Sequence, residues 1–391
     1  MHKKEDFLKD SEFKGLDRRS FLKMAGIAAA GLGLAACAPA AAPTAVPTKA
    51  APAPASSSPA ASAPVATTSS AAADAAADAK LYEAAKKEGQ VMAYTNGTQQ
   101  EWDQFGAAFE KKYPGIKVTG FPGTSEQLRD KVSTEIRAGK PVADVIARDA
   151  FENLSPYLDM GALDKYVSPE WKNLDPKYVD PNGLFAIGSY YVYVHEYNTK
   201  AIPKDQAPKS YADMLKPEYK GKLGLEAAAF PWFTYMLKIM GQDKGMAYMK
   251  ALGAQKPRLV SGHTSLHKLI VSGEIPIAVY MYNFRPMPDK EAGAPVEWVD
   301  PAEVTPAASL LTGVIKNAPH PNAARLMADF MFSDEAAKII ASQYWIPLRK
   351  GFDLGKLADV AKVDMLIVND PNFYKEIAAN EKNFRDIFGQ A

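Results

Sequence analysis

Short apolar runs alternate with amphipathic stretches through the first part of the folded chain. Trp102, Phe105, Phe109 and Tyr113 recur at helical spacing between two apolar runs, and such switching between periods of two and 3.6 predicts strands joined by helices. The expected elements are a strand at 90–97, a helix at 99–113, a strand at 116–121, a helix at 125–139 and a strand at 143–149. Right-handed crossovers fold such a βαβαβ series into a parallel sheet with helices on both faces.

The same alternation continues to residue 343. The expected strands are 190–198, 222–228, 275–283 and 308–317, and the expected helices are 233–241, 245–253 and a pair within 320–343. We therefore predict the α/β fold class. The body of the chain, residues 81–391, exceeds the length at which one hydrophobic core usually stops growing, so two lobes are expected.

The first 36 residues have the composition of an export signal. Arg18 and Arg19 precede an apolar run, residues 24–36, that carries no charge and is too short to span a membrane. The arginine pair followed by Phe-Leu-Lys resembles the twin-arginine signal, which exports folded proteins. A plain basic patch is the alternative interpretation of the pair.

"LAAC", ending at Cys37, resembles the lipobox of bacterial lipoproteins. The resemblance implies cleavage before Cys37, lipidation of its thiol and an extracytoplasmic protein anchored to the cell membrane, because two or more acyl chains hold stably where one does not. Residues 37–78 are rich in Ala, Pro and Ser, which predicts an extended linker to the anchor.

Composition excludes several functions. The chain has 46 basic and 45 acidic residues and a net charge of +1, which gives no field for binding nucleic acid. Cys37 is the only cysteine, so the body has no disulfide, cysteine-ligated metal or thiol nucleophile. It also lacks haem, dinucleotide, nucleophile-elbow and zinc-helix motifs. We expect no cofactor and no enzyme; an exported cofactor enzyme is the weaker alternative.

The segments "ADVI", "EYNTK", "YADMLKPEYKGKLGL", "VSGEIPIAVY" and "GVIKNAPHPNAARLMADFMFSDEAAKII", in this order, resemble the solute-binding proteins of ABC importers, closest to the ferric-iron-binding class. The resemblance implies a monomer with two lobes, a ligand held in the cleft between them, and delivery of that ligand to membrane permease subunits. The chain would cross twice, so lobe 1 would comprise 79–194 and 305–345, and lobe 2 would comprise 195–304 and 346–391.

Candidate ligand-binding residues follow from the positions of the strand ends, because open α/β sheets bind ligands beyond the carboxyl ends of their strands. Several have a structural alternative: a turn at Asn96, a mutual ion pair of Arg148 and Asp149, a core position for Trp232, or a hydrophobic sheet face for Tyr280 and Tyr282. The candidates are Asn96, Thr98, Arg148, Asp149, Glu226, Trp232, His263, Thr264, Ser265, Tyr280, Tyr282, Asn283 and Arg285.

The nature of the ligand depends on which of these candidates contact it. Two arginines favour a carboxylate or phosphate, which they bind bidentately, so we predict a small organic or phosphate-like anion. Ferric iron is the alternative; Tyr280, Tyr282, Asp149 and Glu226 would then be ligands. The ferric class carries two adjacent tyrosines where alignment places Asn283 and Phe284. A metal site shared by His263 and His267 is a minor alternative, since we expect His267 to face solvent.

Overall fold

The computed structural model describes residues 68–299, 301, 303–363, 365–367 and 372–389. The predicted signal peptide, Arg18, Arg19, Cys37 and most of the predicted linker lie outside these residues. Ala73–Ala391 form one compact unit. Within the described residues, no helix combines the length and apolar composition that crossing a membrane requires.

The structure differs from the predicted linker at its end. Helix α2 spans Thr68–Glu88 and so occupies residues 68–78, which we expected to be extended. The last proline before it is Pro64, and alanine, which dominates the first part of α2, is the strongest helix former. The predicted extended linker is therefore wrong for residues 68–78.

The first group of strands is parallel. β1 lies between β2 and β3, and α3 and α4 form the crossovers, each opening with a reciprocal capping box. The elements are β1 (Gln90–Asn96), α3 (Gln99–Lys112), β2 (Lys117–Gly123), α4 (Ser125–Arg137) and β3 (Val145–Ala150), followed by the short helices η3 (Phe151–Asn153) and α5 (Leu154–Asp159). The predicted βαβαβ unit is confirmed.

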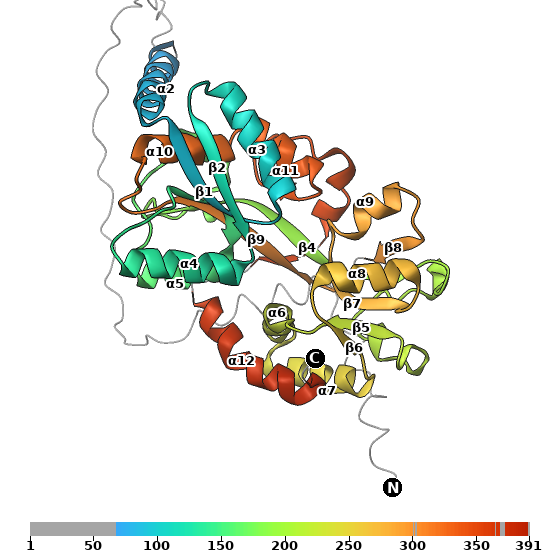
Figure 1. Ribbon diagram of the computed structural model, residues 1–391. Coiled ribbons are helices and arrows are strands. Elements are labelled where there is room, and N and C mark those ends of the chain that lie inside the picture. Colours follow the sequence, from blue (N-terminus) through green and yellow to red (C-terminus); the bar gives the residue numbers. More distant parts are fainter. Residues whose placement is uncertain (1–67, 300, 302, 364, 368–371, 390–391) are drawn as a thin grey trace, which may run out of the picture. The chain divides into compact units, whose positions relative to one another are not determined.

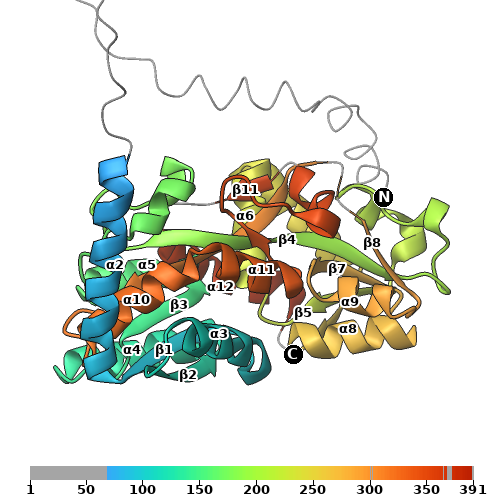
Figure 2. The same cartoon turned by 90° about the horizontal axis from the view of Figure 1, so that it is seen from above.

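Strand β4 joins this group to a second one. Its residues 186–192 pair antiparallel with β9, and from Tyr193 to Tyr197 it pairs antiparallel with β7 (Figures 1 and 2). β7 pairs parallel with β5, and β5 with β6. The elements are β4 (Ala186–Asn198), β5 (Leu223–Glu226), α6 (Phe230–Met240), α7 (Gln242–Ala254), β6 (Arg258–Val260), α8 (His263–Ser272), β7 (Ile277–Tyr282), α9 (Pro286–Glu291) and β8 (Val296–Val299).

The rest of the chain packs on both groups. β9 lies antiparallel between β3 and β4, which gives the order β2-β1-β3-β9-β4-β7-β5-β6. Figure 1 shows α12 beside α6 and α7. The elements are β9 (Thr305–Val314), α10 (Pro321–Met331), α11 (Asp334–Ser342), β10 (Ile346–Pro347), β11 (Met365–Ile367) and α12 (Phe373–Phe388). The predicted mixed α/β class is confirmed, whereas the residue limits of the two lobes remain a prediction.

The largest hydrophobic core contains residues of both strand groups. In the first group Phe109 packs edge-on against Phe330 of α10, and in the second Phe233 packs against Phe384 of α12. Tyr191 and Tyr193 belong to the same core and flank the point where β4 changes partner. The two strand groups therefore meet at an aromatic junction rather than at an aliphatic one.

Candidate ligand-binding site

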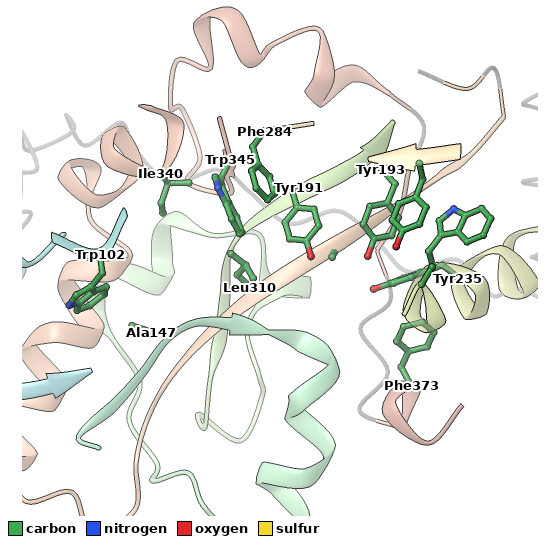
Figure 3. Close-up of a cluster of buried hydrophobic side chains, with 14 of the residues drawn as sticks. Trp102, Ala147, Tyr191, Tyr193, Tyr235, Phe284, Leu310, Ile340, Trp345 and Phe373 are labelled. Carbon is green, nitrogen blue, oxygen red and sulfur yellow. The ribbon is translucent and has the colours of Figure 1, made fainter. Parts of the chain in front are cut away.

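Five tyrosines gather where β4 changes partner, and we call them the tyrosine cluster. They come from β4, α6 and β7: Tyr191, Tyr193, Tyr235, Tyr280 and Tyr282. Because side chains alternate along a strand, the two tyrosines of β4 share one face, as do the two of β7. The ring centroids of Tyr191 and Tyr282 are 4.7 Å apart, and those of Tyr193 and Tyr280 are 5.2 Å apart. Figure 3 shows the hydroxyls of Tyr191, Tyr193 and Tyr235 turned towards one region.

Burial keeps these phenols protonated. It raises the pKa of each tyrosine in the cluster above the ordinary value of 10, and negative charges nearby, including those of Glu226 and Glu152 on Tyr282, raise it further. Each hydroxyl therefore offers one proton to donate and lone pairs to accept. In this state the tyrosine cluster is neutral and suited to hydrogen bonding.

Other aromatic rings extend the cluster. Trp232 stacks on Tyr280 with centroids 5.0 Å apart and planes 5° apart, and His263 stacks on Tyr282 at 3.9 Å. Burial, with the nearby charge of Arg285, lowers the pKa of His263 to about 3, so this imidazole is neutral. Its Nε2 is buried and has no hydrogen-bond partner among the described residues. Trp232 is therefore a core residue, which was the alternative interpretation of its position, and it packs directly on Tyr280 of the cluster.

Arg148 lies on a β-bulge of β3. The register of β3 against β9 shifts between Ala147 and Asp149, and Arg148 takes the left-handed conformation with φ of 60°. Bulges redirect side chains, and left-handed backbone in a residue other than glycine is costly and concentrates at functional sites. The bulge therefore turns the Arg148 side chain out of the alternation expected for a regular strand.

Arg148 is 3% exposed, and aromatic rings hold its guanidinium in place. It lies over the rings of Phe105 and Trp345, 4.9 and 4.5 Å from their centroids, and its Nη1 donates to Oε1 of Gln343 at 3.0 Å. Trp345 in turn packs 5.0 Å from Tyr191. Arg148 is thus fixed beside the tyrosine cluster.

One edge of this guanidinium is unused. Nε and Nη2 are buried, and neither has a hydrogen-bond partner within the described part of the chain. These two atoms form the side edge of a guanidinium, whose parallel N–H groups match two oxygens of a carboxylate or phosphate. Burial lowers the pKa of Arg148 to about 10, so the group remains charged at neutral pH. The edge can bind an anion bidentately.

Arg285 follows β7 on the other strand group. Its guanidinium lies 5.1 Å from the ring of Phe284, and Phe284 stacks on Trp345 at 4.6 Å. The pair Phe284–Trp345 therefore has Arg148 against one member and Arg285 against the other. The Nε of Arg285 is buried and, among the described residues, has no hydrogen-bond partner.

Glu152 brings an acid to the same region. It lies in η3, directly after β3, and its Oε2 is buried without a hydrogen-bond partner in the described structure. Burial raises the pKa of Glu152 to about 7. Its negative charge also raises the pKa of four tyrosines of the cluster, Tyr191, Tyr193, Tyr235 and Tyr282.

Three predicted ligand residues have their polar atoms committed to the protein itself. Asp149 accepts from the Ala150 amide, Asn153 and the Tyr157 hydroxyl. Glu226 accepts from the amides of Ala228 and Gly262, and Asn283 bridges the Val192 amide and the Tyr344 carbonyl. Burial raises the pKa of Asp149 to about 6 despite its hydrogen bonds. Asp149 does not pair with Arg148, which was its alternative role. We leave all three out of the proposed site.

Four further candidates lie around the helix starts. Asn96 donates to Oγ of Ser125, and Thr98 caps α3 by exchanging hydrogen bonds with Glu101, so both have local structural roles. Thr264 and Ser265 are exposed in the first turn of α8. The structure thus places Arg148, His263, Tyr280, Tyr282 and Arg285 at the aromatic junction, whereas these four have a local hydrogen bond, a helix cap or an exposed position.

The expectation that His267 faces solvent is wrong. His267 is 7% exposed; its Nδ1 lies 2.6 Å from Glu196 and its Nε2 lies 2.7 Å from Asp289. The helical face of α8 that carries it packs on β4 and β7. His263 and His267 therefore have different partners. Among the described residues, no group of three His, Cys, Asp or Glu side chains is placed to hold a metal ion.

Several residues of the site were not predicted. Tyr191 and Tyr193 were visible as alternating tyrosines in "YYVYVHEYN", the same signal that identified Tyr280 and Tyr282. Glu152 and Trp345 carry no such signal, since neither lies directly at the end of a predicted strand. They are brought to the site by the turn after β3 and by the segment after α11.

Comparisons with known proteins match this architecture. A curated relative, an uncharacterised protein of Haemophilus influenzae, is 22% identical over 282 residues, which cover 68% of this chain and 80% of that protein. The solved structure of the periplasmic binding protein AfuA from Actinobacillus pleuropneumoniae, with fructose-6-phosphate bound, has a TM-score of 0.68 and 21% identity, covering 77% of this chain and 99% of that chain.

Iron-bound HitA from Pseudomonas aeruginosa has a TM-score of 0.66 and 23% identity, covering 76% of this chain and 99% of that chain. At such identities these structures establish the two-lobe periplasmic-binding-protein fold and not the ligand. The sequence model of bacterial extracellular solute-binding proteins matches residues 140–376. The chain is therefore a solute-binding protein of the ABC-transporter type and not an enzyme, as predicted, and it belongs to the bacterial extracellular solute-binding protein family.

Proposed function

We propose that this solute-binding protein captures a small organic or phosphate-like anion at the aromatic junction. The observation that carries the proposal is the free Nε–Nη2 edge of Arg148, buried and clamped between Phe105 and Trp345. Arg148 forms no ion pair among the described residues, and a buried charge without one is costly, so the arrangement favours a ligand that supplies it. Arg285 and the neutral His263 add donors on the second strand group.

Binding of small anions to the purified full chain tests this proposal. Calorimetry with ethyl phosphate, glycerol 3-phosphate and succinate should find at least one ligand, and Arg148→Gln should weaken it by about 30-fold or more, because one arm of a desolvated charge pair is lost. Arg325→Gln removes a half-exposed arginine that lies over Tyr166 and serves as the matched control. Equal affinities in all three proteins would refute the role of Arg148.

Ferric iron is the second candidate, and the tyrosine cluster is the observation that favours it. Phenolate and carboxylate oxygens are the donors that a hard trivalent cation prefers, and the charge of Glu152 raises the pKa of four of the five tyrosines. Two arginines beside the cluster oppose a bare cation. Titration with ferric citrate distinguishes the two ligands: a visible phenolate charge-transfer band that disappears in Tyr282→Phe would establish iron and reject the organic anion.

The family and the sequence support a proposal for the delivery of the ligand. We propose that the protein is exported through the twin-arginine route by Arg18 and Arg19, is held at the membrane by a lipid on Cys37, and passes its ligand as a monomer to ABC permease subunits. We further propose that the two strand groups on either side of the β4 partner switch act as lobes that close on the ligand. Small-angle scattering should then show compaction on binding, and unchanged radii at saturation would reject closure.

A further inference from the structure

We propose that the ligand also carries a positively charged amine, which binds between Glu152 and the hydroxyls of the tyrosine cluster, so that the solute is a zwitterion. This inference deepens the proposed function and rests on it, because it takes Arg148 as the partner of the anionic group. It assigns a second, oppositely charged subsite beside the tyrosine cluster.

The first observation is the position of Glu152. Its Oε2 is buried without a partner among the described residues, as are Nε and Nη2 of Arg148. η3, which carries Glu152, packs on α12, and the Phe373 ring at the start of α12 lies 4.4 Å from the Tyr235 ring. The charge of Glu152 also raises the pKa of Tyr191 and Tyr193. The unpaired atoms of Arg148 and Glu152 therefore do not bond to each other, and each group needs a ligand group of opposite charge.

The second observation is the set of hydroxyls in the tyrosine cluster. The hydroxyls of Tyr191, Tyr193 and Tyr235 turn towards one region, and the centroids of the last two are 6.0 Å apart (Figure 3). A primary ammonium has three donors and no acceptor, and a carboxylate with surrounding hydroxyl oxygens satisfies all three. Aromatic rings add attraction for a cation through their faces. A neutral hydroxyl ligand would leave the acid without a counter-charge.

The third observation is the arrangement of the two subsites along one aromatic row. Arg148 lies 4.5 Å from the Trp345 ring, Trp345 lies 5.0 Å from Tyr191, and Tyr191 lies 5.9 Å from Tyr193. The row leads from the free guanidinium edge to the tyrosine cluster. A short chain with an anionic group at one end and an amine at the other matches this order of charges.

Matched probe pairs that differ only in the amine test the proposal on the full chain. The pairs are phosphoethanolamine with ethyl phosphate, 3-aminopropyl phosphate with propyl phosphate, and 4-aminobutanoate with butanoate. In the wild type, at least one amine probe should bind about tenfold or more tighter than its partner. Glu152→Gln, which keeps the size of the side chain, should bring that ratio close to one, and Tyr235→Phe should lower it. Glu218→Gln, an exposed acid in η8 (Pro217–Tyr219), is the control and should keep the ratio.

The outcomes separate the two proposals. Arg148→Gln should weaken both members of a pair and preserve their ratio; if it changes neither, the anion proposal fails and the zwitterion fails with it. A ratio near one in every wild-type pair, a ratio that survives Glu152→Gln, or no binding of any probe overturns the amine subsite. Iron loading with a phenolate band that weakens in Glu152→Gln overturns it in favour of a ferric site. Circular dichroism of each variant checks that it is folded.

Discussion

Replacing Arg148 by methionine should abolish anion binding and leave the stability of the ligand-free protein nearly unchanged. Methionine is long and flexible enough to remain between Phe105 and Trp345. Burial lowers the pKa of Arg148 from 12.5 to about 10, so keeping the charge there costs about 3 kcal/mol at neutral pH. Losing the hydrogen bond to Gln343 costs about 1.5 kcal/mol. Losing the contacts of the charge with the Phe105 and Trp345 rings costs about 1 to 2 kcal/mol more. The net change is therefore within about 1 kcal/mol, or about 2 °C in melting temperature.

Calorimetry and thermal unfolding of the ligand-free chain measure the two effects. Arg349→Met is the matched control, because Arg349 is also largely buried but pairs with Glu170 and Asp334 and donates to the Phe332 carbonyl. It should lower stability by about 1 to 3 kcal/mol. If Arg148→Met destabilises the protein as much as Arg349→Met does and leaves anion affinity intact, Arg148 is a structural residue and the reasoning fails.

Three other perturbations have defined outcomes. Burial alone would lower the pKa of His267, but its hydrogen bonds to Glu196 and Asp289 raise that pKa above 6.5. The protonated imidazole therefore stabilises the folded protein fully below pH 6.5, and this contribution is lost as the pH rises through the raised pKa. Denaturant titrations should show His267→Gln less stable than wild type at pH 6, with the gap narrowing towards pH 9; a gap that widens would contradict this sign. Gly120→Ala should cost about 3 kcal/mol or more, because its Cβ would overlap the buried Trp102 ring, and an unchanged melting temperature would show that the ring can move. Cys37→Ala should release the protein from membranes in fractionation, and retention would reject the lipid anchor.

The fold was largely predictable because hydrophobic periodicity reports it directly. Every strand expected between residues 90 and 317 is present, and the predicted helix at 99–113 is α3 within two residues. The end of the linker was not predictable from composition alone, because alanine is common both in extended low-complexity segments and in helices. Once the prolines stop at Pro64, helix propensity decides, and α2 begins at Thr68.

The site was only partly predictable, for a different physical reason. Strand-end position correctly brought Arg148, Tyr280, Tyr282 and Arg285 to one junction. It could not reveal that Asp149, Glu226 and Asn283, which also lie at strand ends, are already hydrogen-bonded to backbone amides and neighbouring side chains. Nor could it reveal the free edge of Arg148, which depends on the bulge in β3 and on Gln343 from the far end of α11. Which polar groups remain unsatisfied is a property of the packed structure.

The most direct test of the central claim is a crystal structure of the protein with the solute that co-purifies with it, identified by mass spectrometry of the same sample. We predict a small ligand whose carboxylate or phosphate accepts hydrogen bonds from both Nε and Nη2 of Arg148, beside the tyrosine cluster. A ferric ion held by Tyr280 or Tyr282, or a solute bound elsewhere while the Arg148 edge contacts nothing of the ligand, would contradict it.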